Sequence, residues 1–210
     1  MPERSSLADF PNLNKYQSQN IWLQNQPLDP TRVVFIGDSI TAFWSAVMPE
    51  YFQNSRYINR GISGQTTPQI YLRFTADVLA LKPAVVVILA GTNDLAGNTG
   101  PATIKTISET IFDMVELAQN HGIKAIMCSV LPAIDFPWSP NQNPAARIIA
   151  LNALLLNYAT THGIAFVDYH SAMADTQNGL PKIYSYDGVH PNKKGYQIMA
   201  PIVDQALAGC

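Results

Sequence analysis

Three residues of types that together can cleave an ester are spread along the chain. The segment "VVFIGDSITAFW" places Ser39 directly after an apolar run at 33–36, and "YDGVHP" places Asp187 three residues before His190. A serine becomes a nucleophile when a histidine takes its proton and a carboxylate orients that histidine. The ordinary alternative for Ser39 is a turn followed by a helix N-cap, a position that serine favours.

The four histidines differ in the chemistry open to them. His121 and His162 each precede a glycine and an apolar run, which is typical of the last turn of a helix before a strand. His170 follows "FVDY" and could reach the sheet edge that carries the serine. His190 is the preferred base, because a short turn can bring the preceding aspartate to its ring, although Asp-x-x-His alone is a weak signal.

N–H groups that could hold an oxyanion follow the predicted strands. Ser39 opens the segment after the first apolar run, so its own N–H can point outward at a helix N-terminus. Gly64, in "GISGQTT", lets the backbone approach a ligand closely, and Asn93, in "AGTND", carries a side-chain amide. The alternatives stay open: Gly64 as a turn residue, and Asn93 as a cap for the segment beginning at Asp94.

The elements that must position these residues alternate between two patterns. Segments with helical spacing, at 68–82, 102–122, 144–163 and 192–208, separate short apolar runs at 33–36, 57–59, 84–90, 124–130 and 164–168. The main apolar runs do not alternate with polar residues, which indicates strands buried on both faces. Strands alternating with helices predict βαβ units and a parallel sheet, with ligands beyond the carboxyl ends of the strands.

The chain of 210 residues is long enough for one sizeable core. We expect a single domain over 1–210. Residues 1–30 form a polar, proline-containing extension, in which weak apolar spacing over 13–23 predicts a helix that packs on the body.

Four short motifs resemble the blocks of a known superfamily. "FIGDSIT", "GISGQT", "GTND" and "DGVHP", in this order over residues 33–192, are similar to the four blocks of the SGNH hydrolases, the GDSL-type esterases and lipases. The first block reads GDSI where the family has GDSL, an exchange that leaves the chemistry intact. The resemblance implies a three-layer α/β/α sandwich with a five-stranded parallel sheet in flavodoxin-like order.

The resemblance also implies the residue roles. Ser39 would be the nucleophile, His190 the base and Asp187 the residue that orients the base. The oxyanion hole would be formed by Ser39, Gly64 and Asn93, and Asp38 would be structural. A serine ester hydrolase of this type is expected to need neither a metal nor a cofactor.

The substrate is less clearly indicated than the reaction. The proline-rich loop "PAIDFPWSPNQNP" is predicted to wall an acyl pocket, and the candidate lining residues are Trp44, Phe136, Trp138, Tyr184 and Tyr186. For each of these aromatic residues, packing in the core or on the surface is the ordinary alternative. Short loops favour a short acyl group such as acetyl. The resemblance allows a carbohydrate acetylesterase, with lysophospholipase or thioesterase activity as alternatives within the family.

Composition excludes other classes. The net charge is −2 and only 13% of residues are charged, so a nucleic-acid partner is not expected and the partner is a small ester. No apolar run is long enough to span a membrane, and the default location is the cytoplasm, or outside it if a signal peptide was removed. Oligomeric state is not indicated. The rival class, a flavodoxin-like ligand-binding module, leaves Asp187 and His190 unexplained and lacks a phosphate-cradling first loop.

Overall fold

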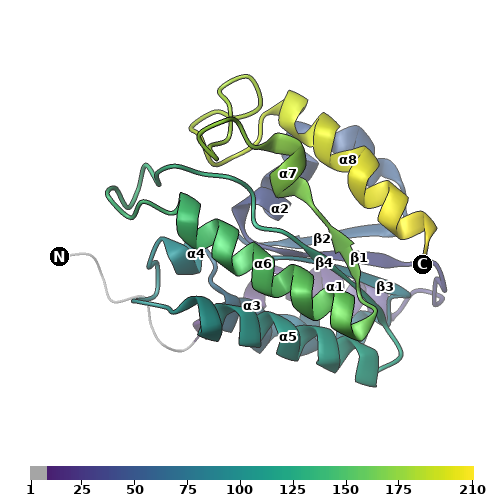
Figure 1. Cartoon of the computed structure of the whole chain (residues 1–210). Coiled ribbons are helices and arrows are strands. Elements are labelled where there is room, and N and C mark those ends of the chain that lie inside the picture. Colours follow the sequence, from purple (N-terminus) through teal and green to yellow (C-terminus); the bar gives the residue numbers. More distant parts are fainter. Residues whose placement is uncertain (1–8) are drawn as a thin grey trace.

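A five-stranded parallel sheet forms the centre of the computed structural model, which describes residues 9–210 (Figure 1). Every neighbouring pair of strands is parallel, and the order is β2-β1-β3-β4-β5. The strands are β1 (Val33–Gly37), β2 (Tyr57–Gly61), β3 (Val85–Leu89), β4 (Lys124–Cys128) and β5 (Ala165–Val167). The predicted flavodoxin-like fold is therefore confirmed.

Helices cover both faces of the sheet (Figure 1). They are α1 (Gln17–Gln24), α2 (Ser39–Val47), α3 (Thr67–Asp77), α4 (Thr92–Leu95), α5 (Ile104–Asn120), α6 (Ala145–His162), α7 (Tyr169–Met173) and α8 (Lys193–Ala208). Short 3-10 turns lie at Leu13–Lys15, Pro49–Gln53 and Leu79–Leu81. The four segments predicted to be helical correspond to α3, α5, α6 and α8, whereas α4 and α7 are too short to show a helical period.

Alternate residues of β1 enter two separate cores. Val34 and Ile36 pack with side chains of α3, α5 and α6 on one face. Val33 and Phe35 pack with side chains of α2, α7 and α8 on the other face. Successive side chains of a strand point to opposite faces, so a central strand buried on both faces must be apolar throughout. All five residues of β1 are buried, as the apolar run predicts.

Buried polar side chains join α1 to the sheet. Asn20 donates to Asp77 at 2.6 Å and accepts from the Nε of Arg60 at 2.9 Å. Asp77 in turn pairs with Arg73 at 2.8 Å. The Arg60 guanidinium also lies over the Tyr16 ring, 4.6 Å from its centroid. Residues 1–8 of the predicted N-terminal extension lie outside the described residues.

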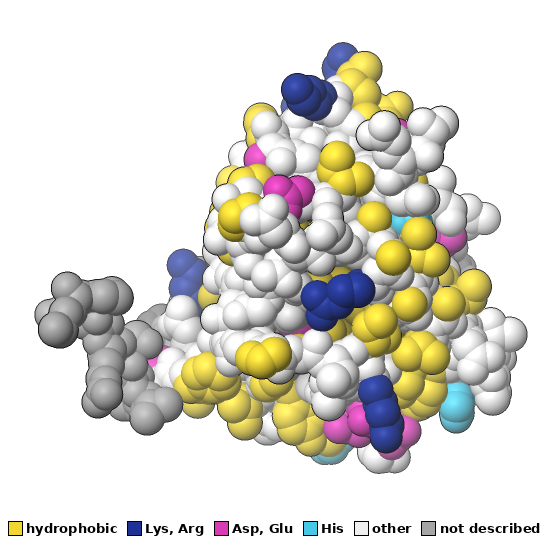
Figure 2. Space-filling model, turned by 60° about the vertical axis from the view of Figure 1, so that its left-hand side comes forward, with side chains coloured by type: hydrophobic (Ala, Val, Ile, Leu, Met, Phe, Trp, Pro, Cys, Tyr) yellow, Lys and Arg dark blue, Asp and Glu magenta, His cyan; other side chains and the backbone are white. Residues whose placement is uncertain are grey.

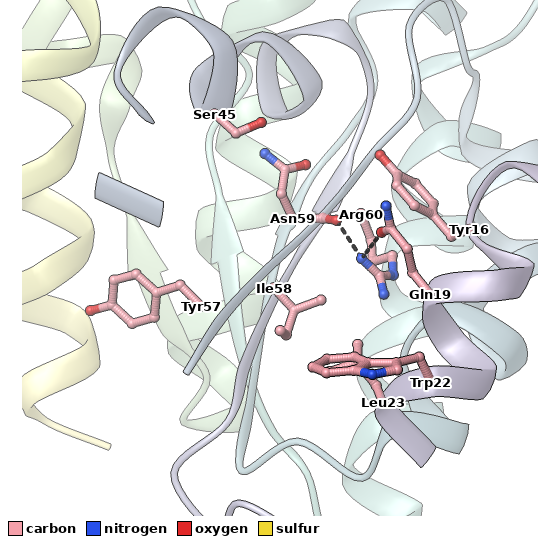
Figure 3. Close-up of a pocket in the computed structure, with 9 residues that line it drawn as sticks. All are labelled: Tyr16, Gln19, Trp22, Leu23, Ser45, Tyr57, Ile58, Asn59 and Arg60. Carbon is pink, nitrogen blue, oxygen red and sulfur yellow. Dashed lines mark hydrogen bonds between the residues drawn. The ribbon is translucent and has the colours of Figure 1, made fainter. Parts of the chain in front are cut away.

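A cavity of about 360 Å³ lies between α1 and the edge strand β2 (Figure 3). Trp22 and Gln19 line it from the helix, and Ile58 and Arg60 line it from the strand (Figure 3). None of the residues predicted to do chemistry lines it, so the site must be sought elsewhere.

The surface agrees with the low charge of the sequence. On the face shown in Figure 2, charged side chains are few, and hydrophobic and uncharged polar side chains cover most of it. No helix within residues 9–210 is long and apolar enough to cross a membrane.

Candidate active site

The predicted serine stands at the carboxyl end of the central strand β1, where α2 begins. The residue that caps α2 is Asp38, whose carboxylate accepts from the Ile40 N–H at 2.9 Å. The ordinary interpretation of Ser39 as the N-cap is therefore wrong by one residue. Because Asp38 satisfies the helix end, the Ser39 hydroxyl is available for another partner.

That partner is His190. The Oγ of Ser39 lies 2.9 Å from Nε2 of His190, and Nδ1 of the same ring lies 2.7 Å from Oδ2 of Asp187. Ser39, near the start of the sequence, is thus joined to His190 and Asp187, near its end, in one continuous series of hydrogen bonds. Ser39 is buried, whereas the other two side chains are part-exposed.

The loop before α8 holds Asp187 against the histidine. Oδ1 of Asp187 accepts the backbone N–H groups of Val189 at 3.0 Å and His190 at 2.8 Å. This tight turn passes through Gly188 at a φ of 86°, a conformation that costs glycine little. Burial acts to raise the pKa of Asp187, but the hydrogen bonds from His190 and Val189 outweigh it and lower that pKa.

The ionisation of Asp187 determines the tautomer of His190. A carboxylate with a lowered pKa is ionised at neutral pH and can only accept hydrogen bonds. Nδ1 of His190 must then carry the proton, which leaves Nε2 with a lone pair facing the Ser39 hydroxyl. The geometry therefore presents an acceptor to the serine proton.

Two buried side chains hold the turn that carries Ser39. Arg73 donates to the carbonyl of Gly37 at 2.9 Å, and its guanidinium is fixed by Asp77 and by Gln65. On the other side of the sheet, the Tyr196 hydroxyl donates to the Ile40 carbonyl at 2.7 Å. The end of β1 and the first turn of α2 are thus fixed from α3 and from α8.

Two of the three predicted oxyanion donors have free N–H groups. Among the described residues, neither the Ser39 N–H nor the Gly64 N–H donates to a protein acceptor. Both residues line the same cavity, and Gly64 adopts a φ of 77° in the turn after β2. The arrangement offers two unused donors beside the serine hydroxyl.

The third predicted donor, Asn93, already has acceptors. Its amide donates to the carboxylate of Asp38 at 3.2 Å and to the carbonyl of Gln65 at 3.1 Å. Asn93 also lies inside the first turn of α4, whose N-cap is Gly91, so the alternative role as a cap is wrong. Donation from Asn93 to a ligand would therefore require one of these two long bonds to be shared or released.

Two buried aspartates lie beneath the cavity. Burial raises the pKa of Asp38 to about 6, despite the hydrogen bond from Ile40. Burial also raises the pKa of Asp94, which accepts the Thr67 N–H at 3.0 Å and the Thr67 hydroxyl at 2.7 Å. Asp94 thereby connects α4, which carries Asn93, to the start of α3, which follows the turn that carries Gly64.

The cavity beside the serine has a volume of about 240 Å³. Two aromatic rings lie near the imidazole of His190: Phe43 at 5.3 Å and Trp138 at 5.7 Å between ring centroids. The lining residues are Ser39, Phe43, Ser63, Gly64, Asn93, Asn98, Trp138 and His190.

Three of these lining residues were not predicted from the sequence: Phe43, Ser63 and Asn98. Phe43 was detectable, because a residue four positions after Ser39 shares its helix face.

Of the five aromatic residues predicted to wall the pocket, only Trp138 lines it. Trp44, one position beyond Phe43, faces the core and stacks on Tyr196 with ring centroids 5.2 Å apart. Phe136 is fully buried beneath Trp138. Tyr184 packs against the core that includes α8, and Tyr186 is 70% exposed on the turn before His190. These four residues do not line the cavity, because the sequence pattern shows neither which way a loop side chain turns nor, for Trp44, which face of α2 meets the core.

The alternative base, His170, lies outside the cavity that contains Ser39. It lines a separate cavity with Asp168 and residues of α6, and its backbone N–H donates to the Ser129 hydroxyl at 2.9 Å. Burial lowers the pKa of His170, and its Nε2 has no partner among the described residues. The structure brings His190, and not this histidine, to the serine.

The sequence profile of the GDSL-like Lipase/Acylhydrolase family matches residues 35–198. The chain belongs to that family. The match spans all the motifs identified in the sequence, from the strand before Ser39 to the helix after His190. The predicted family and the enzyme class, a carboxylic ester hydrolase, are confirmed at this level.

Relatives of this GDSL-family chain include one solved structure and two curated esterases. The structure, a GDSL-like lipase from Bacteroides thetaiotaomicron, is 42% identical, with a TM-score of 0.92, and the match covers 95% of this chain and 98% of that one. An acetylxylan esterase of Xylanibacter ruminicola is 28% identical over 89% of this chain, but the chain spans only 45% of that protein. An acetylxylan esterase of Geobacillus stearothermophilus is 26% identical over 80% of this chain and 90% of its own length.

Proposed function

We propose that this chain is a serine esterase that removes short acyl groups, above all acetyl, from a carbohydrate. The observation that carries the proposal is the hydrogen-bonded chain from Ser39 through His190 to Asp187, which opens into a small cavity with two free backbone N–H groups. Neither the cavity between α1 and β2 nor the cavity beside His170 holds a serine hydroxyl hydrogen-bonded to a histidine ring.

In the proposed reaction, the Oγ of Ser39 attacks the ester carbonyl while Nε2 of His190 takes its proton. The carbonyl oxygen becomes an oxyanion held by the N–H groups of Ser39 and Gly64, joined by Asn93 if it releases an internal bond. The intermediate collapses to an acyl-enzyme, and the imidazolium returns the proton to the leaving alcohol. Water, deprotonated by the same nitrogen, then releases the acid and restores the serine.

Electrostatics support this sequence of proton transfers. The lowered pKa of Asp187 keeps its carboxylate ionised at neutral pH, where it stabilises the imidazolium that forms during attack. Each oxyanion donor of this kind contributes about 3–4 kcal/mol to lowering the barrier in acyl transfer.

The size of the cavity supports a short acyl group. About 240 Å³ between Phe43 and Trp138 is below the usual range for drug-sized ligands, roughly 300–1,000 Å³. The names of the two acetylxylan esterase relatives support an acetyl ester of a carbohydrate. Lysophospholipase activity, and thioesterase activity toward long acyl chains, would require more room than this cavity has.

An acyl-chain series tests the substrate. With p-nitrophenyl esters, we expect kcat/KM to be highest for acetate and to fall at least tenfold by octanoate, since one methylene in a tight pocket changes the barrier by about 1–3 kcal/mol. Acetate release from acetylated xylo-oligosaccharides should exceed that from acetylcholine, a non-carbohydrate control. A higher kcat/KM for octanoate than for acetate would contradict the proposed acetylesterase and favour lysophospholipase or thioesterase activity.

A labelling experiment tests the reaction class. A serine-directed phosphonate should add one phosphonyl group to the protein, located at Ser39 by peptide mass mapping. The Ser39→Ala variant should remain unlabelled and lose roughly 10⁴–10⁶-fold in kcat. Absence of labelling and of esterase activity in the wild-type protein would favour the ligand-binding module, whereas full turnover by Ser39→Ala would mean that another residue is the nucleophile.

A further inference from the structure

Asn98 forms hydrogen bonds with the two segments that carry Gly64 and Asn93, which are proposed oxyanion donors. Its amide nitrogen donates to the carbonyl of Gly64 at 3.1 Å and to Oδ1 of Asn93 at 2.9 Å. Both hydrogens of one side-chain amide are thus used to join the turn after β2 to the first turn of α4. Asn98 is exposed, yet three of the four hydrogen bonds its side chain can make go to protein atoms.

The third bond comes from Trp138. Its indole Nε1 donates to Oδ1 of Asn98 at 2.9 Å. The segment that carries Trp138 is also fixed beside it, because the Ser139 hydroxyl donates to the carbonyl of Ala96 at 2.8 Å. The ring that lies 5.7 Å from His190 is therefore connected to Asn98 by a direct bond.

The direction of these bonds restricts the orientation of both amides. An indole N–H can only donate, so the atom of Asn98 that faces Trp138 must be its oxygen. The nitrogen of Asn98 then faces Asn93, so the atom of Asn93 that receives it must be an oxygen as well. The amide nitrogen of Asn93 is left on the side of Asp38 and of the Gln65 carbonyl, which are acceptors.

We propose that Trp138 and Asn98 form a relay of hydrogen bonds that positions the Asn93 amide and the Gly64 turn for oxyanion binding. Both are positioning residues: they act on the reaction through Asn93 and Gly64. This inference rests on the proposed function, because it assigns a role in the transition state of ester cleavage. It also gives Trp138 a function beyond that of a pocket wall.

Two substitutions of Asn98, one by alanine and one by aspartate, test the proposed relay of hydrogen bonds. Asn98→Ala removes the two donors, and we expect kcat to fall about tenfold with KM within twofold, a fraction of the ~10²–10³-fold lost with a whole donor. Asn98→Asp still accepts from Trp138 but places carboxylate oxygens against Asn93 Oδ1 and the Gly64 carbonyl. It should invert the Asn93 amide and lower kcat about 100-fold. If Asn98 were merely a structural brace, the repulsion introduced by aspartate would lower the unfolding midpoint and raise KM together with the loss of kcat.

Controls separate the relay from folding and from the proposed function. Asn141→Asp makes the same exchange on the loop of Trp138, where the side chain makes no hydrogen bond within the described residues, and should leave kcat unchanged. Trp138→Phe keeps the ring but removes its N–H, and combined with Asn98→Ala it should lower kcat no further than Asn98→Ala alone. All variants should keep the wild-type unfolding midpoint within about 2 °C.

The outcomes are distinguishable. If Asn98→Asp and Asn98→Ala lower kcat equally, or if Trp138→Phe and Asn98→Ala act additively, the relay is wrong. If these variants behave as expected but Ser39→Ala retains activity, the proposed nucleophile fails instead.

Discussion

At the scale of single residues, Asp38 has two tasks that oppose one another. Its carboxylate caps α2 and accepts the Asn93 amide, which holds the nucleophile turn beside α4. Both tasks use the ionised form, but full burial disfavours that form and raises the pKa of Asp38 to about 6. Asp38 therefore fixes the turn that carries Ser39, while its buried charge lowers the stability of the fold.

The Asp38 carboxyl should make stability depend on pH. Because its folded pKa lies above the ordinary 3.8, the group stabilises the fold below about pH 4, and that contribution is lost as pH rises through 6. The change amounts to about 3 kcal/mol. We expect the free energy of unfolding of Asp38→Asn, relative to wild type, to rise by this amount between pH 4 and pH 7 in urea titrations. Asp29→Asn, whose exposed carboxylate has a pKa lowered by Thr31, should change in the opposite direction.

The two competing histidines allow a direct comparison. His190→Asn removes the acceptor of the serine proton, so kcat should fall about 10⁴-fold or more. His170→Asn alters a side chain that lines a separate cavity, so kcat should stay within threefold. Initial rates with p-nitrophenyl acetate measure both, and equal losses would contradict the proposed base.

At the scale of elements, the approach of α2 to β2 depends on glycine. A Cβ at Gly61 would lie 2.1 Å from the backbone nitrogen of Ala42, so no side chain fits between the edge strand and the helix that begins at Ser39. The backbone atoms around Ala42 belong to that helix and cannot turn aside as a flexible side chain could. The close packing of α2 against β2 at Gly61 thus fixes the position of Ser39, the first residue of α2.

Gly61→Ala should consequently affect both stability and rate. Overpacking costs about 1–3 kcal/mol, which for a chain of this size lowers the melting temperature by about 2–12 °C. The displaced helix should also lower kcat, since a shift of about 1 Å at a reacting group can cost about 100-fold. Gly209→Ala, with 3.5 Å to its nearest contact, is the control and should change neither quantity. A stable, fully active Gly61→Ala would show that α2 can move freely.

At the scale of the whole molecule, the strands and the edge that carries the site could be predicted from the hydrophobic pattern, whereas the strand order was implied only by the resemblance to a known superfamily. Apolar runs set the strands, and the parallel sheet brought the loops of Gly64, Asn93 and His190 to one edge. The direction of side chains in loops could not be predicted. Phe136 turned inward from its loop, and Asn98 acquired its place only through bonds to distant segments. On α2, the pattern also did not show that Trp44 faces the core.

The polar connection between α1 and the sheet leads to a last prediction about the whole chain. Asn20 is buried between Asp77 and Arg60, and Asp77 holds the Arg73 side chain that binds the Gly37 carbonyl. Asn20→Ala should cost about 1–3 kcal/mol, because it leaves buried polar partners unsatisfied. Since Arg73 keeps Asp77 and Gln65, the nucleophile turn should stay in place and kcat should remain within twofold.

Ile21→Ala on the exposed face of the same helix is the matched control for Asn20→Ala, and its change in unfolding free energy should be within 0.5 kcal/mol. Thermal unfolding with initial rates at 25 °C measures both variants. Equal destabilisation by the two would mean that α1 is held by its surface rather than by its buried amide. A fall in kcat without a fall in stability would mean that Asn20 influences the position of Ser39 through Asp77 and Arg73.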